Sequence, residues 1–148
     1  YMLDHVLGGD IRLPAGEVPT PFLDIDDVAD IAVEALTDDR HIGELYELTG
    51  PRSLTFAEAA AEIGEAAGRE IRYTPVTLEQ HEVELAEHGV APDVIELLTY
   101  LFKEVVDGRN ADTTDGVQRA LGREPRDFSA YARETAATGV WTSSAVSA

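Results

Sequence analysis

Asp24, Asp26 and Asp27 bring three carboxylates together within four residues. On an extended segment, alternating carboxylates can converge on Mg²⁺ or Ca²⁺. The same side chains can instead accept hydrogen bonds from the unpaired amides at a helix N-terminus, where negative charge is also favourable. Because apolar residues with helical spacing begin at Val28, we favour the capping role and predict no metal site.

His81 and Glu82 are adjacent on a predicted helix, which invites comparison with zinc proteases. That chemistry requires a second histidine four residues after the first, but position 85 is a leucine. His88 would lie about 10 Å from His81 along a helix axis, too far to share one ion. We therefore expect a solvated acidic helix face. The chain also lacks the Gly-x-Ser-x-Gly turn that presents a hydrolase nucleophile, and we name no catalytic residue.

Four aromatic residues are candidates for an apolar substrate pocket, because pockets for planar ligands are built from such side chains. They are Phe22, Tyr73, Tyr100 and Phe102. The alternative is that these residues belong to the ordinary hydrophobic core.

Apart from the adjacent Gly8 and Gly9, the glycines stand singly, most of them in loops or at the predicted ends of helices and strands. No Gly-x-Gly-x-x-Gly loop lies between a strand and a helix, where it would hold the pyrophosphate of a dinucleotide. The chain by itself therefore supplies no such site, and we assign no cofactor-binding residue.

Capping signals and hydrophobic periodicity divide the chain into helices and strands. Thr55 with Glu58 and Thr77 with Gln80 form capping boxes at two helix starts. Helices are predicted at residues 1–7, 27–36, 55–67, 77–88, 92–106, 117–121 and 128–137, and strands at 45–49 and 71–76. An extended connection is predicted at 11–21, followed at 22–25 by a short strand or strand-like approach to a helix.

The segment that begins at Pro92 is the most hydrophobic of the predicted helices. We expect its stripe of Leu97, Leu98, Leu101 and Phe102 to be buried, because large apolar side chains on a soluble helix need a partner surface.

Composition restricts the class of protein. The net charge of −18 arises from 29 acidic and 11 basic residues, and a field of that sign repels nucleic acid. No stretch has the length and apolarity of a membrane span, and none has the pattern of a secretory leader. With no cysteine, we expect a cytoplasmic protein without disulfides. The acidic excess is also typical of proteins adapted to a saline cytoplasm; codon bias is the alternative for the scarcity of lysine.

Four segments resemble the second half of NmrA-like proteins, which belong to the atypical short-chain dehydrogenase/reductase superfamily. They are residues 22–32 (FLDIDDVADIA), 46–51 (YELTGP), 54–60 (LTFAEAA) and 121–131 (LGREPRDFSAY). Order and spacing both match, and the resemblance covers residues 1–141. Residues 142–148 are predicted to be a flexible tail.

The resemblance implies an α/β, helix-rich fold: the C-terminal substrate lobe and last sheet elements of a Rossmann-type NAD(P)-binding protein. In that family an N-terminal Rossmann half holds NAD or NADP through a glycine loop. This sequence has nothing that corresponds to that loop.

The implied function is the substrate-binding part of an NAD(P)-dependent oxidoreductase that transfers hydride to a small carbonyl, quinone or similar acceptor. A non-catalytic NAD(P)-sensing regulator is the alternative. The expected partners are the missing N-terminal Rossmann half or a second copy of the chain, and a small-molecule substrate. Apolar surface should lie open near Phe22, Leu23, Ile25 and residues 45–48.

Overall fold

The computed structural model describes residues 2–142 of the chain; most of the predicted flexible tail, residues 143–148, lies outside the described residues. The α-helices are α1 (Met2–Gly8), α2 (Ile25–Thr37), α3 (Phe56–Ala67), α4 (Leu78–Glu87), α5 (Pro92–Tyr100), α6 (Gly116–Leu121) and α7 (Phe128–Ala137). The strands are β1 (Asp10–Leu13) and β2 (Arg72–Pro75). A 3-10 turn follows α2 at Asp39–His41, and α5 continues into a π-helical turn at Leu101–Val105.

The two strands form a parallel pair in which Ile11 lies opposite Tyr73 and Leu13 opposite Pro75. The predicted strand at 71–76 is confirmed, with its proline at the strand end. The predicted connection at 11–21 is wrong in its first part, which is β1. Ile11 and Leu13 alternate with polar residues and are buried on one face, a pattern that the nearby prolines obscured in the sequence.

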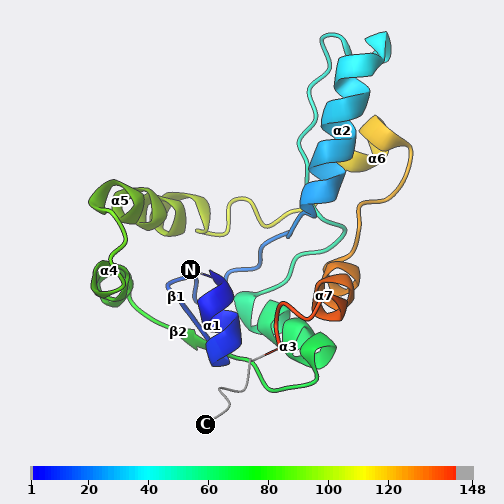
Figure 1. Cartoon of the computed structure of the whole chain (residues 1–148). Helices are drawn as coiled ribbons and strands as arrows, with labels where there is room; N and C mark the ends of the chain where they lie inside the picture. Colours follow the sequence, from blue (N-terminus) through cyan, green and yellow to red (C-terminus); the bar gives the residue numbers. More distant parts are fainter. Residues whose placement is uncertain (1, 143–148) are drawn as a thin grey trace.

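The main core lies where α3 and α7 pack on each other and on the small sheet (Figure 1). Small residues on both helices, Ala60 on α3 and Ala132 on α7, are buried there. The core comprises Val6, Ile11, Leu13, Ala60, Ile63, Ile71, Ala132 and Trp141. A second, smaller cluster joins α2 to α6 through Ile31, Val117 and Ala120. Helix α2 thus projects from the main body with α6 beside it (Figure 1).

The predicted capping signals are confirmed in the structure. Thr55 with Glu58 and Thr77 with Gln80 make reciprocal capping-box hydrogen bonds at α3 and α4. Asp24 accepts a hydrogen bond from the Asp26 amide at the start of α2. Asp24 thus has the predicted capping role.

Asp27 does not share the capping role of Asp24, because its side chain is completely buried, with 0% exposed. Its carboxylate accepts hydrogen bonds from the backbone amide and from Nη1 of Arg126, and it pairs with Arg123. It therefore ties α2 to the connection between α6 and α7. In the part of the chain that the structure describes, no group of three potential ligands is arranged to hold a metal ion.

Three further predictions are wrong in whole or in part. Residues 45–49 form neither a strand nor a helix. The helix that begins at Pro92 forms, but only half of its predicted stripe is covered: Leu98 and Phe102 are half-buried, and Phe102 packs on the main core. Leu97 is 55% exposed and Leu101 is also exposed, because α5 packs mainly on α4. His81, predicted on a solvated face, is 1% exposed, with the edge of its ring against Phe102.

No helix among residues 2–142 is long and apolar enough to cross a membrane.

Candidate functional site

Phe56, in the first turn of α3, is the centre of an aromatic cluster. The ring of Phe22 contacts it edge to face, with the two ring centroids 5.2 Å apart. The ring of Tyr73 stacks on it, with the centroids 6.2 Å apart. Phe102 completes the group at 6.5 Å. The structure therefore brings three of the four predicted pocket residues around one ring that the sequence analysis did not single out.

Tyr100, the fourth predicted residue, lies elsewhere. Its side chain is 58% exposed on α5 and makes no ring contact with the cluster among the described residues. The hydroxyl of Tyr73 donates to the carbonyl oxygen of Leu13, and burial raises the Tyr73 pKa. The Tyr73 side chain is therefore anchored on β1.

An apolar cavity of about 380 Å³ lies between α1, α3 and α7, beside this cluster. Its aromatic walls are Phe22, Phe56, Phe128, Tyr131 and Trp141. Phe22 and Phe128 are in direct contact, with ring centroids 5.2 Å apart. Cavities of this size and lining bind small apolar or planar groups. Of the predicted residues only Phe22 reaches the cavity; Tyr73 and Phe102 lie behind Phe56.

A smaller pocket of about 280 Å³ shares Phe22, Phe128 and Tyr131 with the first. Its other walls include Asp24 and Arg126. The three shared rings therefore separate the apolar cavity from a pocket that has charged walls. The guanidinium of Arg126 is already paired with Asp27 and Asp30.

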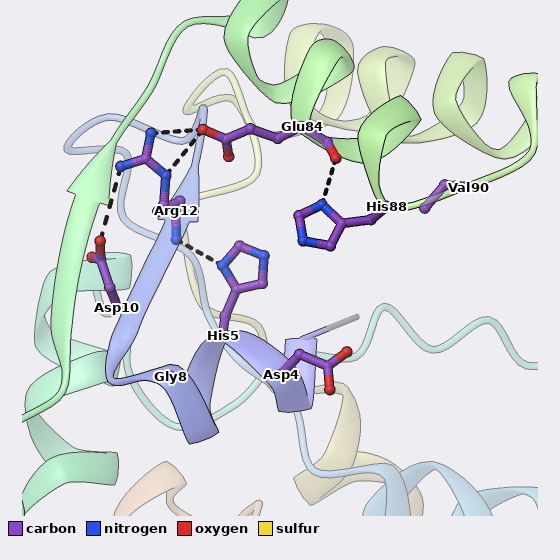
Figure 2. A pocket seen from close by; sticks show the side chains of 8 residues that line it. All are labelled: Asp4, His5, Gly8, Asp10, Arg12, Glu84, His88 and Val90. Carbon is purple, nitrogen blue, oxygen red and sulfur yellow. Dashed lines mark hydrogen bonds and ion pairs between the residues drawn. The ribbon is translucent and has the colours of Figure 1, made fainter.

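A third pocket, of about 450 Å³, lies where α1, β1 and α4 meet (Figure 2). Nε and Nη2 of Arg12 both donate to Oε1 of Glu84, at 3.0 and 2.6 Å. This hydrogen bonding lowers the pKa of Glu84 and raises that of Arg12. A second carboxylate lies beside Arg12: Oδ2 of Asp10 is 3.9 Å from its Nη1. The arginine on β1 is therefore largely neutralised by its neighbours.

Two histidines face each other across this third pocket (Figure 2). The Arg12 amide donates to Nδ1 of His5, so the neutral His5 ring carries its proton on Nε2. Nδ1 of His88 donates to the Glu84 carbonyl oxygen, so the neutral His88 ring has its lone pair on Nε2. In these tautomers one ring is a donor and the other an acceptor, an arrangement suited to a neutral polar group and not to a metal ion held by both rings.

Local sequence contained no signal for this third pocket. His5 and Arg12 come from the first elements, whereas Glu84 and His88 come from α4, and Arg12 is 72 residues from Glu84. Only the packing of α4 against β1 brings them together.

No protein-family model matches the chain. It is 36% identical over 136 residues to the oxidoreductase YesF of Bacillus subtilis, covering 90% of this chain and 48% of that protein. It is 34% identical to the NAD(P)H azoreductase of Xenophilus azovorans, covering 87% of this chain and 45% of that protein. The chain thus spans about half the length of the curated relatives it matches.

Solved structures show the same fold. The triphenylmethane reductase of Citrobacter, complexed with NADP(H), matches with a TM-score of 0.78 at 22% identity, covering 90% of this chain and 46% of that one. The Escherichia coli quinone oxidoreductase QOR2, complexed with NADPH, matches with a TM-score of 0.78 at 19% identity over the same shares. The α/β, helix-rich fold is that of the C-terminal half of Rossmann-type NAD(P)-dependent reductases, which confirms the predicted fold class.

Proposed function

We propose that residues 1–141 are the substrate-binding C-terminal part of an NAD(P)-dependent oxidoreductase of the NmrA-like type. The observation that carries this proposal is identity of 34% or more, over most of the chain, to an oxidoreductase and to an NAD(P)H azoreductase. The reaction is hydride transfer to a small carbonyl, quinone or similar acceptor.

NAD or NADP is held by another part of the protein. The described residues contain no glycine loop between a strand and a helix: β1 is followed by a turn, and β2 leads into α4 through Val76 and Thr77, with no glycine. They therefore do not fit the pyrophosphate of the cofactor, and no step of the reaction is assigned to a residue of this chain.

The apolar cavity beside Phe22 binds the acceptor. Its aromatic lining suits a planar molecule, because stacked and edge-to-face ring contacts add to the burial of apolar area. Tyr73 and Phe102 act indirectly, by holding Phe56 in place. Tyr100 does not line this cavity and lies on the exposed side of α5, so the acceptor site proposed here does not include it.

The test uses the unmatched part of Xenophilus azovorans NAD(P)H azoreductase, joined to the N-terminus of this chain. Oxidation of NADH and NADPH is followed with a small quinone, an azo dye and a triphenylmethane dye. Phe22→Ala should raise KM for these acceptors about tenfold, which corresponds to about 1.4 kcal/mol of lost binding. Leu97→Ala, an exposed change on α5, is the control.

Two results would contradict the proposal. An unchanged KM in Phe22→Ala for every acceptor would remove the cavity from the substrate site. Binding of NADPH without oxidation in the presence of any acceptor would favour the sensing regulator instead. For the chain alone, calorimetry should detect no NAD(P) binding, and a dissociation constant near 1 μM would show that a dinucleotide site is present here.

A further inference from the structure

Helix α5 and the π-helical turn that continues it have a row of apolar side chains in solvent. These side chains recur at intervals of three or four residues, which is the spacing of one helix face. We call them the outer stripe: Val94, Leu97, Leu101 and Val105, all of which are exposed. Tyr100, 58% exposed, lies beside this stripe. Another side of the same helix, with Leu98 and Phe102, is half-buried.

The outer stripe is separate from the apolar surface that the sequence led us to expect. Ile25 and Leu45 of that expected surface are exposed. The other residues named for it are half-buried: Phe22, Leu23 and Leu48. Helix α5 lies well apart from α2 in the fold (Figure 1). Large apolar side chains gathered in solvent mark an interaction site, so the outer stripe needs a covering surface of its own.

Two opposite charges border the outer stripe along one edge. Glu96 and Lys103 are seven residues apart, so they lie on the same side of the helix, about two turns or about 10 Å from each other. Both are exposed. Lys103 is the only lysine of the chain, and its Nζ is 3.8 Å from the carboxylate of Glu104. Glu96 makes no ion pair within the described residues. The two charges are therefore too far apart to pair with each other inside one copy.

The outer stripe and its charged edge are complementary to a second copy of themselves. In an antiparallel pair of α5 helices, a two-fold axis just after Thr99 sets Val94 of one copy level with Val105 of the other. The same register sets Glu96 of one copy level with Lys103 of the other. A two-fold axis brings the same edge of both helices together, so this ion pair forms twice.

This association should be weak. Each copy has a net charge of −18, and Asp93 and Glu104, at the two ends of the outer stripe, approach each other between the copies. One pair of short helices also buries less than the roughly 1,200 Å² of a stable interface. The chain should therefore be monomeric in dilute unfolding and activity experiments and should associate only when it is concentrated.

We propose that the outer stripe of α5 is a self-association surface, on which two copies of the chain pair antiparallel with reciprocal ion pairs between Glu96 and Lys103. The occupant is a second copy because one register matches both the apolar and the charged positions of the two helices. This inference is independent of the proposed function.

Sedimentation of the 148-residue chain from about 1 μM to about 1 mM covers the range of weak association. Potassium chloride at about 0.15 M screens the net charge beyond about 8 Å. Glu96→Lys and Lys103→Glu should each raise the dissociation constant about fivefold or more, because each places like charges opposite one another. The double variant exchanges the two charges and should restore the wild-type constant within about twofold.

The Glu96→Lys variant distinguishes pairing from general repulsion. This change makes the chain less negative, so it would strengthen association if net charge alone decided the outcome. Leu97→Glu should weaken association about tenfold or more, because it places a charge in the centre of the interface. Leu36→Glu, at the 87% exposed leucine of α2, adds the same charge and should leave association unchanged. Circular dichroism of each variant at about 1 μM reports whether the monomer is folded.

Several results would overturn the proposal. They are the absence of association up to the highest concentration, wild-type association in both single charge variants, and a double variant as weak as the single ones. Loss of association in Leu36→Glu but not in Leu97→Glu would place the contact on α2 instead. Fusion of the chain to the unmatched part of the Xenophilus azovorans azoreductase should preserve the association; a fusion that stays monomeric would show that the other half covers α5, and the proposal would be wrong.

Discussion

Arg126 donates two hydrogen bonds of 2.7 Å to the carboxylate of Asp27, from its backbone amide and from Nη1, across 99 residues of sequence. The carboxylate is inaccessible to solvent, whereas the guanidinium is partly exposed. The pair therefore joins α2 to the chain between α6 and α7, and Arg123 is a second partner of the same buried charge.

Replacing this buried carboxylate should be costly. Asp27→Ala removes the buried carboxylate that Arg123 and Arg126 share, although both arginines are partly exposed and keep Asp30 as a partner. Loss of hydrogen bonds to a charged group, here including the one from the Arg126 amide, should cost about 1.5 to 3 kcal/mol. Urea denaturation measures the free energy of unfolding. Asp112→Asn, at an exposed position, should change that free energy by less than about 0.5 kcal/mol. Equal effects of the two changes would contradict the structural role of Asp27.

Asp127 should make stability depend on acid. Its hydrogen bonds from Arg52 hold its pKa well below the ordinary range, and it also caps α7 through the Ser129 amide. A lowered carboxyl pKa in the folded state stabilises the fold above the unfolded value of about 3.9, and this contribution is lost as pH falls below it. The free energy of unfolding should therefore be larger for the wild type than for Asp127→Asn at pH 6, and this difference in free energy should be smaller at pH 3. A constant gap in urea melts would contradict this assignment.

His81 should produce a second pH dependence, at higher pH. Burial lowers its pKa in the folded state, so the unfolded chain binds the proton more readily than the folded chain. Stability is full above the unfolded value of about 6.5 and falls as pH drops below it. Thermal melts at pH 7.5 and 5.5 should show a larger loss for wild type than for His81→Gln. His88→Gln, at an exposed position, should behave as wild type.

Leu13 and Leu97 should differ sharply as sites of truncation. Leu13 is buried in the main core, and Leu13→Ala should cost about 2 to 5 kcal/mol. Leu97 lies on the exposed side of α5, and Leu97→Ala should cost less than about 0.5 kcal/mol. Chemical denaturation of both variants measures these losses in the free energy of unfolding. A large loss in Leu97→Ala would mean that the stripe on α5 is buried in solution, as the sequence alone had suggested.

Salt should stabilise the chain if adaptation to a saline cytoplasm explains the net charge of −18. Potassium ions screen the repulsion among carboxylates over a Debye length of about 3 Å at 1 M, against about 10 Å at 0.1 M. The melting temperature should then rise between low and molar KCl. A melting temperature that stays constant or falls as KCl increases would contradict salt adaptation and favour codon bias as the explanation of the composition.

Helix starts and stops could be predicted from sequence because the interactions that set them are local. In the capping boxes of Thr55 with Glu58 and Thr77 with Gln80, both partners lie three residues apart, so the pattern of letters contains the whole interaction. The left-handed glycine after α3, Gly68, is local in the same sense. The order of helices and the class of fold followed from such signals and from the resemblance.

Burial and the candidate site depended on contacts between distant segments. The stripe of α5 was expected to be buried because periodicity shows that a helix has an apolar face, but it does not show whether a surface lies against that face. His81 was expected in solvent because its neighbours in sequence are acidic, yet packing places it against Phe102. Residues 45–49 have the alternation of a strand, but a strand also needs a partner's backbone.

Phe56 was missed although it is central, because nothing distinguishes a phenylalanine at a helix start from any other core residue. Its role arises from three rings contributed by the segment before α2, by β2 and by the turn after α5. The pair of Arg12 and Glu84 is likewise made only when α4 packs on β1. Residue type and short-range spacing thus determined the elements and their order, whereas tertiary packing decided which side chains meet, because it alone brings distant parts of the chain within hydrogen-bonding and van der Waals distance.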